Sequence, residues 1–90
     1  MLHFPGFDST AARFLFGERA TKALAVDTLS LDPGNSQGLD THYFWLGANR
    51  WGLECVANLE RLPPLGAWLM ASPPRVVGAS GGVSRVVALL

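Results

Sequence analysis

Short apolar runs, each bounded by loop-forming residues, constrain the fold of this chain more than any other feature of its sequence. Such runs indicate buried strands when Pro, Gly, Asn, Asp and Ser lie between them. They predict strands over residues 22–28, 50–56, 67–71 and 84–90, with loop chemistry in 29–39 and a flexible turn in 78–82.

A helical segment precedes these runs. Residues 10–19 carry apolar side chains at helical spacing, and Asp8 or Ser9 can serve as the N-cap. Ala20 stands where a left-handed C-cap is expected, at a cost on the order of 1 kcal/mol relative to glycine. A short helical turn is also predicted over 41–46, capped by Asp40 or Thr41.

The order of these elements predicts an α/β or α+β fold, with a mixed sheet and one main N-terminal helix. Ninety residues correspond to a single small domain, 1–90. Only 16% of the residues are charged and 49% are hydrophobic, whereas a typical soluble domain has roughly 25% charged residues. We therefore expect part of the surface to be buried against a second copy or against the remainder of a larger domain.

Charge and cysteine content exclude several classes of protein. The net charge is +0 and the basic residues are scattered, so no basic face for nucleic acid is expected. The single cysteine, Cys55, excludes an internal disulfide and a CxxC zinc site. No apolar run approaches the roughly 18–20 residues of a membrane span, and the start does not resemble a signal peptide. The expectation is a soluble, cytoplasmic protein that contacts neither nucleic acid nor membrane.

His42 and Glu54, twelve positions apart, are the candidate metal ligands. A histidine and a carboxylate are the groups that a borderline divalent metal prefers, and a nearby carboxylate or carbonyl could fix the tautomer of the ring. Glu54 lies within an apolar run, where an ionised carboxylate is costly unless it is paired or bound to metal. The alternative is a capped surface histidine and a glutamate that faces solvent, and spacing alone favours this alternative.

Other polar residues are weaker candidates. Asp27 and Ser30 follow a predicted strand, where ligand sites gather in open sheets, so they could contact substrate or orient a metal-bound histidine. An Asx-turn is the alternative for Asp27. Residues 80–85 could wrap an anion with backbone amides, although a plain hairpin turn is favoured. Cys55 is expected to be a small buried hydrophobe rather than a nucleophile.

A succession of short motifs, in matched order and spacing over nearly the whole chain, resembles the C-terminal part of the cyclase family. This family of metal-dependent hydrolases includes kynurenine formamidase-like and isatin hydrolase-like proteins. The motifs are HFPGF-x-S-x-x-A-x-x-L, A-x-x-VDTLSLD-x-G, H-x-x-W-L, R-W-G-x-E, A-N-L and G-A-S-G-G-x-S-R-V-x-A-L-L.

The resemblance implies a swivelling β/β/α domain that hydrolyses amide or lactam bonds with a divalent metal, zinc or manganese. It also implies two sources of ligands. The first is an N-terminal signature, H-x-G-T-H-x-D-x-P-x-H, whose last histidine assists proton transfer. The second is a later histidine with a glutamate twelve residues on, and His42 and Glu54 match this pair in type and spacing.

The chain departs from the family because its 90 residues contain nothing like the N-terminal signature. Since a catalytic zinc needs about three protein ligands, the chain alone is expected to be inactive. We therefore expect a truncated or split amide hydrolase that carries the His/Glu half of the metal site, with a small-molecule amide substrate. The alternative is a non-catalytic oligomeric module derived from the family. The partner would be a separate N-terminal half or further copies of the chain, which could also bring His3 to His42 and Glu54.

Overall fold

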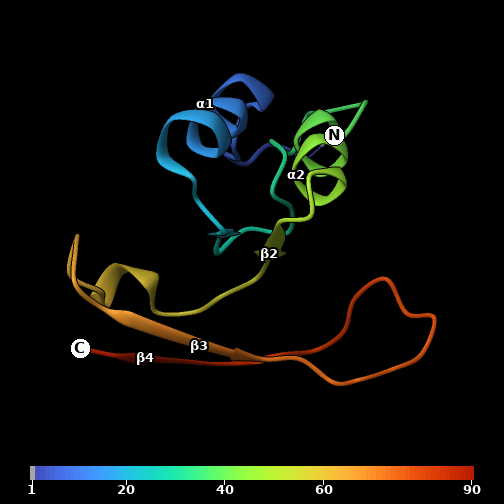
Figure 1. Ribbon diagram of the computed structural model, residues 1–90. Helices are drawn as coiled ribbons and strands as arrows, with labels where there is room; N and C mark the ends of the chain where they lie inside the picture. The colour runs from blue at the N-terminus through green and yellow to red at the C-terminus, as the bar shows by residue number, and fades with distance from the viewer. Residues whose placement is uncertain (1) are drawn as a thin grey trace. The chain divides into compact units, whose positions relative to one another are not determined.

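The computed structural model describes residues 2–90, which divide into two compact units. The first unit ends at Leu59 and the second comprises Glu60–Leu90. The first unit contains helix α1, strand β1, helix α2 and strand β2, and the second contains strands β3 and β4 (Figure 1). The expectation of one domain over 1–90 stays a prediction.

Helix α1 spans Ser9–Arg19, so it begins one residue before the predicted 10–19 and ends where the sequence predicts. The side chain of Asp8, the N-cap, accepts a hydrogen bond from the amide of Thr10. Ala20 has φ 51° and ψ 35°, which is the left-handed conformation of a C-cap. Its N–H donates to the carbonyl of Leu15, so the cap forms although no glycine is present.

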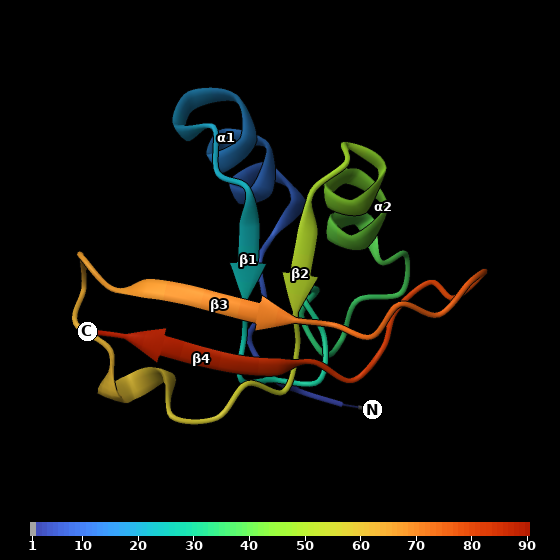
Figure 2. The ribbon, with the colours of Figure 1, turned by 60° about the horizontal axis from the view of Figure 1, so that its bottom comes forward.

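Strands β1 (Ala23–Ala25) and β2 (Trp51–Leu53) pair in parallel (Figure 2). Parallel neighbours need a crossover connection, and here helix α2, Asp40–Gly47, lies between the two strands in sequence. The turn predicted over 41–46 is thus an eight-residue helix, Asp40–Gly47. The first unit is therefore built around a βαβ connection, and α1 precedes it.

The core of the first unit lies between the helices and the strand pair. Ala12, Leu24, Leu31 and Trp45 are its buried apolar residues. Trp45 is completely buried, and its Nε1–H donates to the carbonyl of Trp51 over 2.9 Å. A buried indole thus keeps its hydrogen bond, because it reaches the first residue of β2.

The second unit is an antiparallel ribbon of β3 (Trp68–Ser72) and β4 (Arg85–Leu89). Trp68 pairs with Leu89 at one end and Ser72 with Arg85 at the other. Pro63 and Pro64 lie between β2 and β3, and they lack the N–H donors that would continue a ladder. The 3₁₀ turn Leu59–Arg61 precedes these prolines and spans the boundary between the units.

The predicted combination of helices with parallel and antiparallel strands is confirmed, with one difference. The parallel pair and the antiparallel pair belong to separate sheets rather than to one mixed sheet. Among residues 2–90, no helix is long and apolar enough to cross a bilayer. The expectation of a cytoplasmic protein stays a prediction.

Candidate metal centre

The N-terminus of α2 is capped by a carboxylate from the preceding loop, that of Asp32. Its Oδ1 accepts from the amide of Thr41 and its Oδ2 from the amide of His42, both over 2.9 Å. Leu39, the N-cap residue, makes no side-chain cap hydrogen bond. The prediction that Asp40 or Thr41 caps this helix is therefore wrong, because both residues lie inside its first turn.

The same carboxylate also holds the ring of His42. Nδ1 of His42 lies 2.8 Å from Oδ2 of Asp32, whose side chain is only 3% exposed. Burial acts to raise the pKa of Asp32. Hydrogen bonds from the His42 ring and from the amides of His42 and Thr41, with the charge of His42, outweigh burial and hold that pKa below its ordinary value. Asp32 is thus an ionised acceptor at neutral pH.

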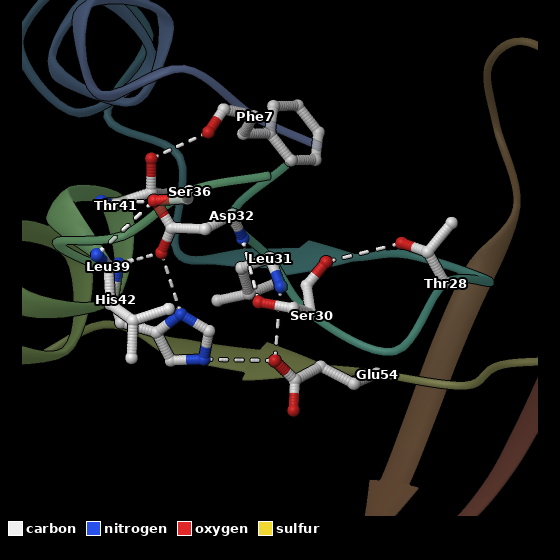
Figure 3. A network of polar contacts seen from close by, with 10 residues as sticks. All are labelled: Phe7, Thr28, Ser30, Leu31, Asp32, Ser36, Leu39, Thr41, His42 and Glu54. Atoms are coloured by element: carbon white, nitrogen blue, oxygen red, sulfur yellow. Dashed lines mark hydrogen bonds and ion pairs between the residues drawn. The ribbon is translucent and has the colours of Figure 1, made fainter. Parts of the chain in front are cut away.

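The opposite nitrogen of the ring faces Glu54, as Figure 3 shows. Nε2 of His42 lies 2.9 Å from Oε2 of Glu54, which is about one-third exposed. The same Oε2 accepts a hydrogen bond from the amide of Leu31 over 3.0 Å. The imidazole therefore lies between a buried carboxylate at Nδ1 and a more exposed carboxylate at Nε2.

The geometry of this pair fits one part of a metal centre. In octahedral coordination, two neighbouring ligand atoms about 2.1 Å from one ion lie about 3 Å apart, which is close to the 2.9 Å between Nε2 and Oε2. In tetrahedral coordination they lie about 3.4 Å apart, so a tetrahedral ion would require the two side chains to separate slightly. A histidine that binds metal through one nitrogen usually donates from the other to a carboxylate or carbonyl, which is the relation of Nδ1 to Asp32. In residues 2–90, however, no group of three or more His, Cys, Asp or Glu side chains could hold a metal ion. His42 and Glu54 thus fit a site that needs further ligands.

The remaining candidates lie around this pair rather than in it. Asp27 is exposed, and the carboxylate beside His42 is that of Asp32 instead. Ser30 is half-buried, and its hydroxyl accepts from the amide of Asp32 over 3.1 Å. Cys55 is exposed, so the expectation of a buried thiol is wrong. With φ 59°, Cys55 turns the chain directly after Glu54 and carries its own side chain into solvent.

Asp32 is the site residue that sequence reasoning missed. It belongs to the Asp-Pro-Gly run of the 29–39 segment, which is typical of a turn. A turn alone is therefore enough to explain an aspartate at this position. The signal that could have found it is the start of α2. The residue before the helix is Leu39, which has no capping side chain, so the helix needed an acceptor from elsewhere.

The first unit thus combines a βαβ connection with a His–Glu pair beside a buried carboxylate. No family model matches the chain. It is 28% identical to an isatin hydrolase of Roseibium aggregatum over 98% of its length, and 35% identical to a kynurenine formamidase of Sphingopyxis alaskensis over 80%. It covers 35% and 34% of those two proteins.

Solved structures agree with these relatives. Isatin hydrolase A from Ralstonia solanacearum matches 96% of the chain with a TM-score of 0.90 at 40% identity, and the chain covers 34% of that protein. Isatin hydrolase A from Labrenzia aggregata, bound to benzyl benzoate, matches 93% with a TM-score of 0.89 at 36% identity, again with 34% covered. By sequence and by structure, the chain is thus similar to part of the isatin hydrolase-like and kynurenine formamidase-like proteins, which supports the predicted resemblance to the C-terminal part of the cyclase family. It spans about a third of the length of the curated relatives that it matches.

Proposed function

We propose that His42 and Glu54 are the metal ligands that this chain contributes to a divalent-metal hydrolase site. The observation that carries the proposal is the 2.9 Å approach of Nε2 of His42 to Oε2 of Glu54, with Nδ1 of the same ring held by Asp32. The remaining ligands would come from the two-thirds of the family domain that these 90 residues do not match. Zinc or manganese suits an imidazole and a carboxylate.

When bound at such a site, a divalent ion polarises the scissile carbonyl and lowers the pKa of a water molecule. The residues of this chain would bind the ion or hold a ligand in position. His42 offers the lone pair of Nε2, Glu54 offers a negative carboxylate, and Asp32 keeps the imidazole ring in place. The proton-transfer group is not among these residues, so we propose that the chain alone is inactive.

The substrate that we propose is a small aromatic amide or lactam. This follows from the names of the relatives, an isatin hydrolase and a kynurenine formamidase. Isatin hydrolase A from Labrenzia aggregata is bound to benzyl benzoate, which is an aromatic ester. Isatin and N-formylkynurenine are therefore the substrates to test first.

A non-catalytic oligomeric module is the second candidate. Two observations favour it: His42 and Glu54 are too few for a closed site in residues 2–90, and many large apolar side chains are exposed. The two candidates differ in what happens when the other part of the domain is supplied. The hydrolase gains activity, whereas the module stays inert.

The test uses this chain together with a separately produced polypeptide. That polypeptide comprises the part of the Ralstonia solanacearum isatin hydrolase A that this chain does not match. Hydrolysis of isatin and N-formylkynurenine is measured with Zn²⁺ or Mn²⁺ for each polypeptide alone and for the mixture. We expect hydrolysis only in the mixture, and loss of at least tenfold with His42→Ala or Glu54→Gln.

Binding of the metal provides a second measurement. The isolated chain should bind Zn²⁺ weakly, since two ligands hold metal less well than three or four. His42→Ala should remove this binding. A mixture that forms a complex yet stays inert with both metals and both substrates would exclude the hydrolase and favour the module.

A further inference from the structure

One loop segment, Ser30–Asp32, contacts both candidate ligands. The amide of Leu31 donates to Oε2 of Glu54, and the carboxylate of the next residue, Asp32, accepts from the ring and the amide of His42 (Figure 3). The amide of Asp32 in turn donates to the hydroxyl of Ser30. Adjacent residues of one loop thus fix the two ligand atoms relative to each other.

Asp32 holds the ring of His42 more firmly than Glu54 does. Its Oδ2 receives both the amide and Nδ1 of His42, over 2.9 and 2.8 Å, so the ring is held relative to the first turn of α2. The carboxylate is 3% exposed, and water does not compete for these hydrogen bonds. Glu54 is 37% exposed and can exchange its contact with Nε2 for water.

We infer that Asp32 is a positioning residue that keeps the ring proton of neutral His42 on Nδ1. Nε2 is then left with a free lone pair on the side of Glu54, where a divalent cation would bind. This inference rests on the proposed function for the identity of the ligands. It goes further by assigning to Asp32 the orientation of the histidine, which was expected of Asp27 or Ser30.

A neutral imidazole has one N–H, and its position depends on which neighbour accepts more strongly. Both carboxylates can accept. Asp32 is the stronger acceptor of the ring N–H, because its oxygens are fixed by the amides of Thr41 and His42 and are shielded from water. The resulting arrangement, carboxylate to Nδ1–H and open Nε2, is that of a metal-binding histidine whose second nitrogen is held in place.

The direct test is the tautomer of His42 in the full chain without metal. Nitrogen-15 NMR on ¹⁵N-histidine-labelled protein, at a pH where the imidazole is neutral, distinguishes Nδ1–H from Nε2–H. His42→Gln assigns the signals against those of His3. We expect Nδ1–H for the wild-type chain, and a predominant Nε2–H tautomer would overturn the inference.

The variant test compares Asp32→Asn with Asp40→Asn. The asparagine introduced at position 32 is neutral, and only one of its two terminal groups accepts. One carboxylate oxygen of Asp32 is therefore replaced by an NH₂ group that only donates, so the amides of Thr41 and His42 and the ring Nδ1–H can no longer all be accepted. Asp40→Asn removes a carboxylate from the same helical turn, at an exposed residue for which no hydrogen bond or ion pair with the His42 ring is found in the described residues. Circular dichroism checks that both variants fold.

We expect a smaller share of the Nδ1–H tautomer and a 10- to 100-fold weaker affinity for Zn²⁺, measured by NMR titration, in Asp32→Asn. Asp40→Asn should match the wild type in both measurements. If Asp32→Asn folds and keeps both the wild-type tautomer and the wild-type affinity, the charge of Asp32 does not position the ring. If it fails to fold, the wild-type tautomer still decides the question. If His42→Ala leaves Zn²⁺ binding unchanged, the proposed function fails, while the tautomer result stands separately.

Discussion

Gly6 lies against the backbone of the residue that anchors His42. A Cβ placed at Gly6 would be 2.5 Å from the nitrogen of Pro33 and 2.7 Å from the carbonyl oxygen of Asp32. Backbone atoms cannot move aside as a side-chain end can, so Gly6→Ala must displace one of the two segments. We expect a loss of about 1–3 kcal/mol in the free energy of unfolding, measured by urea denaturation.

Gly17→Ala is the matched control for Gly6→Ala. Gly17 lies within α1, and a Cβ there would meet nothing within 4 Å. The same substitution should therefore stabilise the chain by roughly 0.5–1 kcal/mol, because glycine costs backbone entropy inside a helix. Equal effects of the two substitutions would contradict the close approach at Gly6.

At the scale of residues, type and spacing suggested His42 and Glu54, but only the family resemblance favoured them over a surface pair. Asp32 could not be found in this way. Its role depends on the loop meeting the start of α2, which is a tertiary contact between residues that no local pattern links. Cys55 shows the opposite case, in which a local pattern led to a wrong prediction. The apolar run predicted a buried side chain, but the chain turns there at φ 59° and the side chain is exposed.

At the scale of elements, the C-cap of α1 is a strained position. Ala20 adopts φ 51°, a left-handed conformation that costs an L-residue with a Cβ roughly 1–2 kcal/mol. Ala20→Gly should raise the free energy of unfolding by about 1 kcal/mol, and thermal denaturation should show a higher Tm.

Ala11→Gly provides the control, since the same change at an exposed position inside α1 should lower stability by about 1 kcal/mol. The same substitution is thus expected to raise the free energy of unfolding at position 20 and to lower it at position 11. If both substitutions destabilise the chain, the cap at Ala20 is not strained in solution.

The helices and the ribbon were largely predictable, whereas the predicted strands 22–28 and 50–56 are the much shorter β1 and β2, so that Glu54 lies just after a strand and not within it. The ends of α1 followed from Asp8 and Ala20, and β3 and β4 lie within one residue of the predicted runs 67–71 and 84–90. The length of α2 was underestimated because its capping group comes from Asp32 in another segment. Strand pairing could not be predicted either, since short apolar runs carry no information on which of them become neighbours.

At the scale of the whole molecule, large apolar side chains are exposed in both units, among them Tyr43 in the first and Leu65, Trp68 and Val77 in the second. The low fraction of charged residues predicted uncovered apolar surface, but not which residues would form it.

The ribbon of β3 and β4 carries much of that surface. Trp68 and Leu89 face each other in the register and are 78% and 57% exposed, and Met70 follows on the same face. A two-stranded ribbon is marginally stable by itself and gains stability when a face is covered. An apolar pair so exposed is therefore the first candidate for contact with another polypeptide.

We predict that the chain self-associates at micromolar concentration unless the complementary part of the domain is present. Sedimentation velocity should show species larger than the monomer. The double variant Trp68→Gln/Leu89→Gln should shift the protein to the monomer, because two glutamines opposite each other replace the apolar pair with groups that water solvates well. Val77→Thr, at a fully exposed position in the connection between β3 and β4, should leave association unchanged.

Comparison of the wild type, the double variant and Val77→Thr shows whether the chain self-associates and whether the ribbon forms the interface. Monomeric wild-type protein at this concentration would contradict the argument from exposed surface. Equal association of the wild type and the double variant would place the interface away from the ribbon. Dissociation by the double variant alone, followed by weaker binding of the complementary polypeptide, would show that self-association and domain completion use the same face. In that case the oligomer and the split hydrolase would be competing states of one chain.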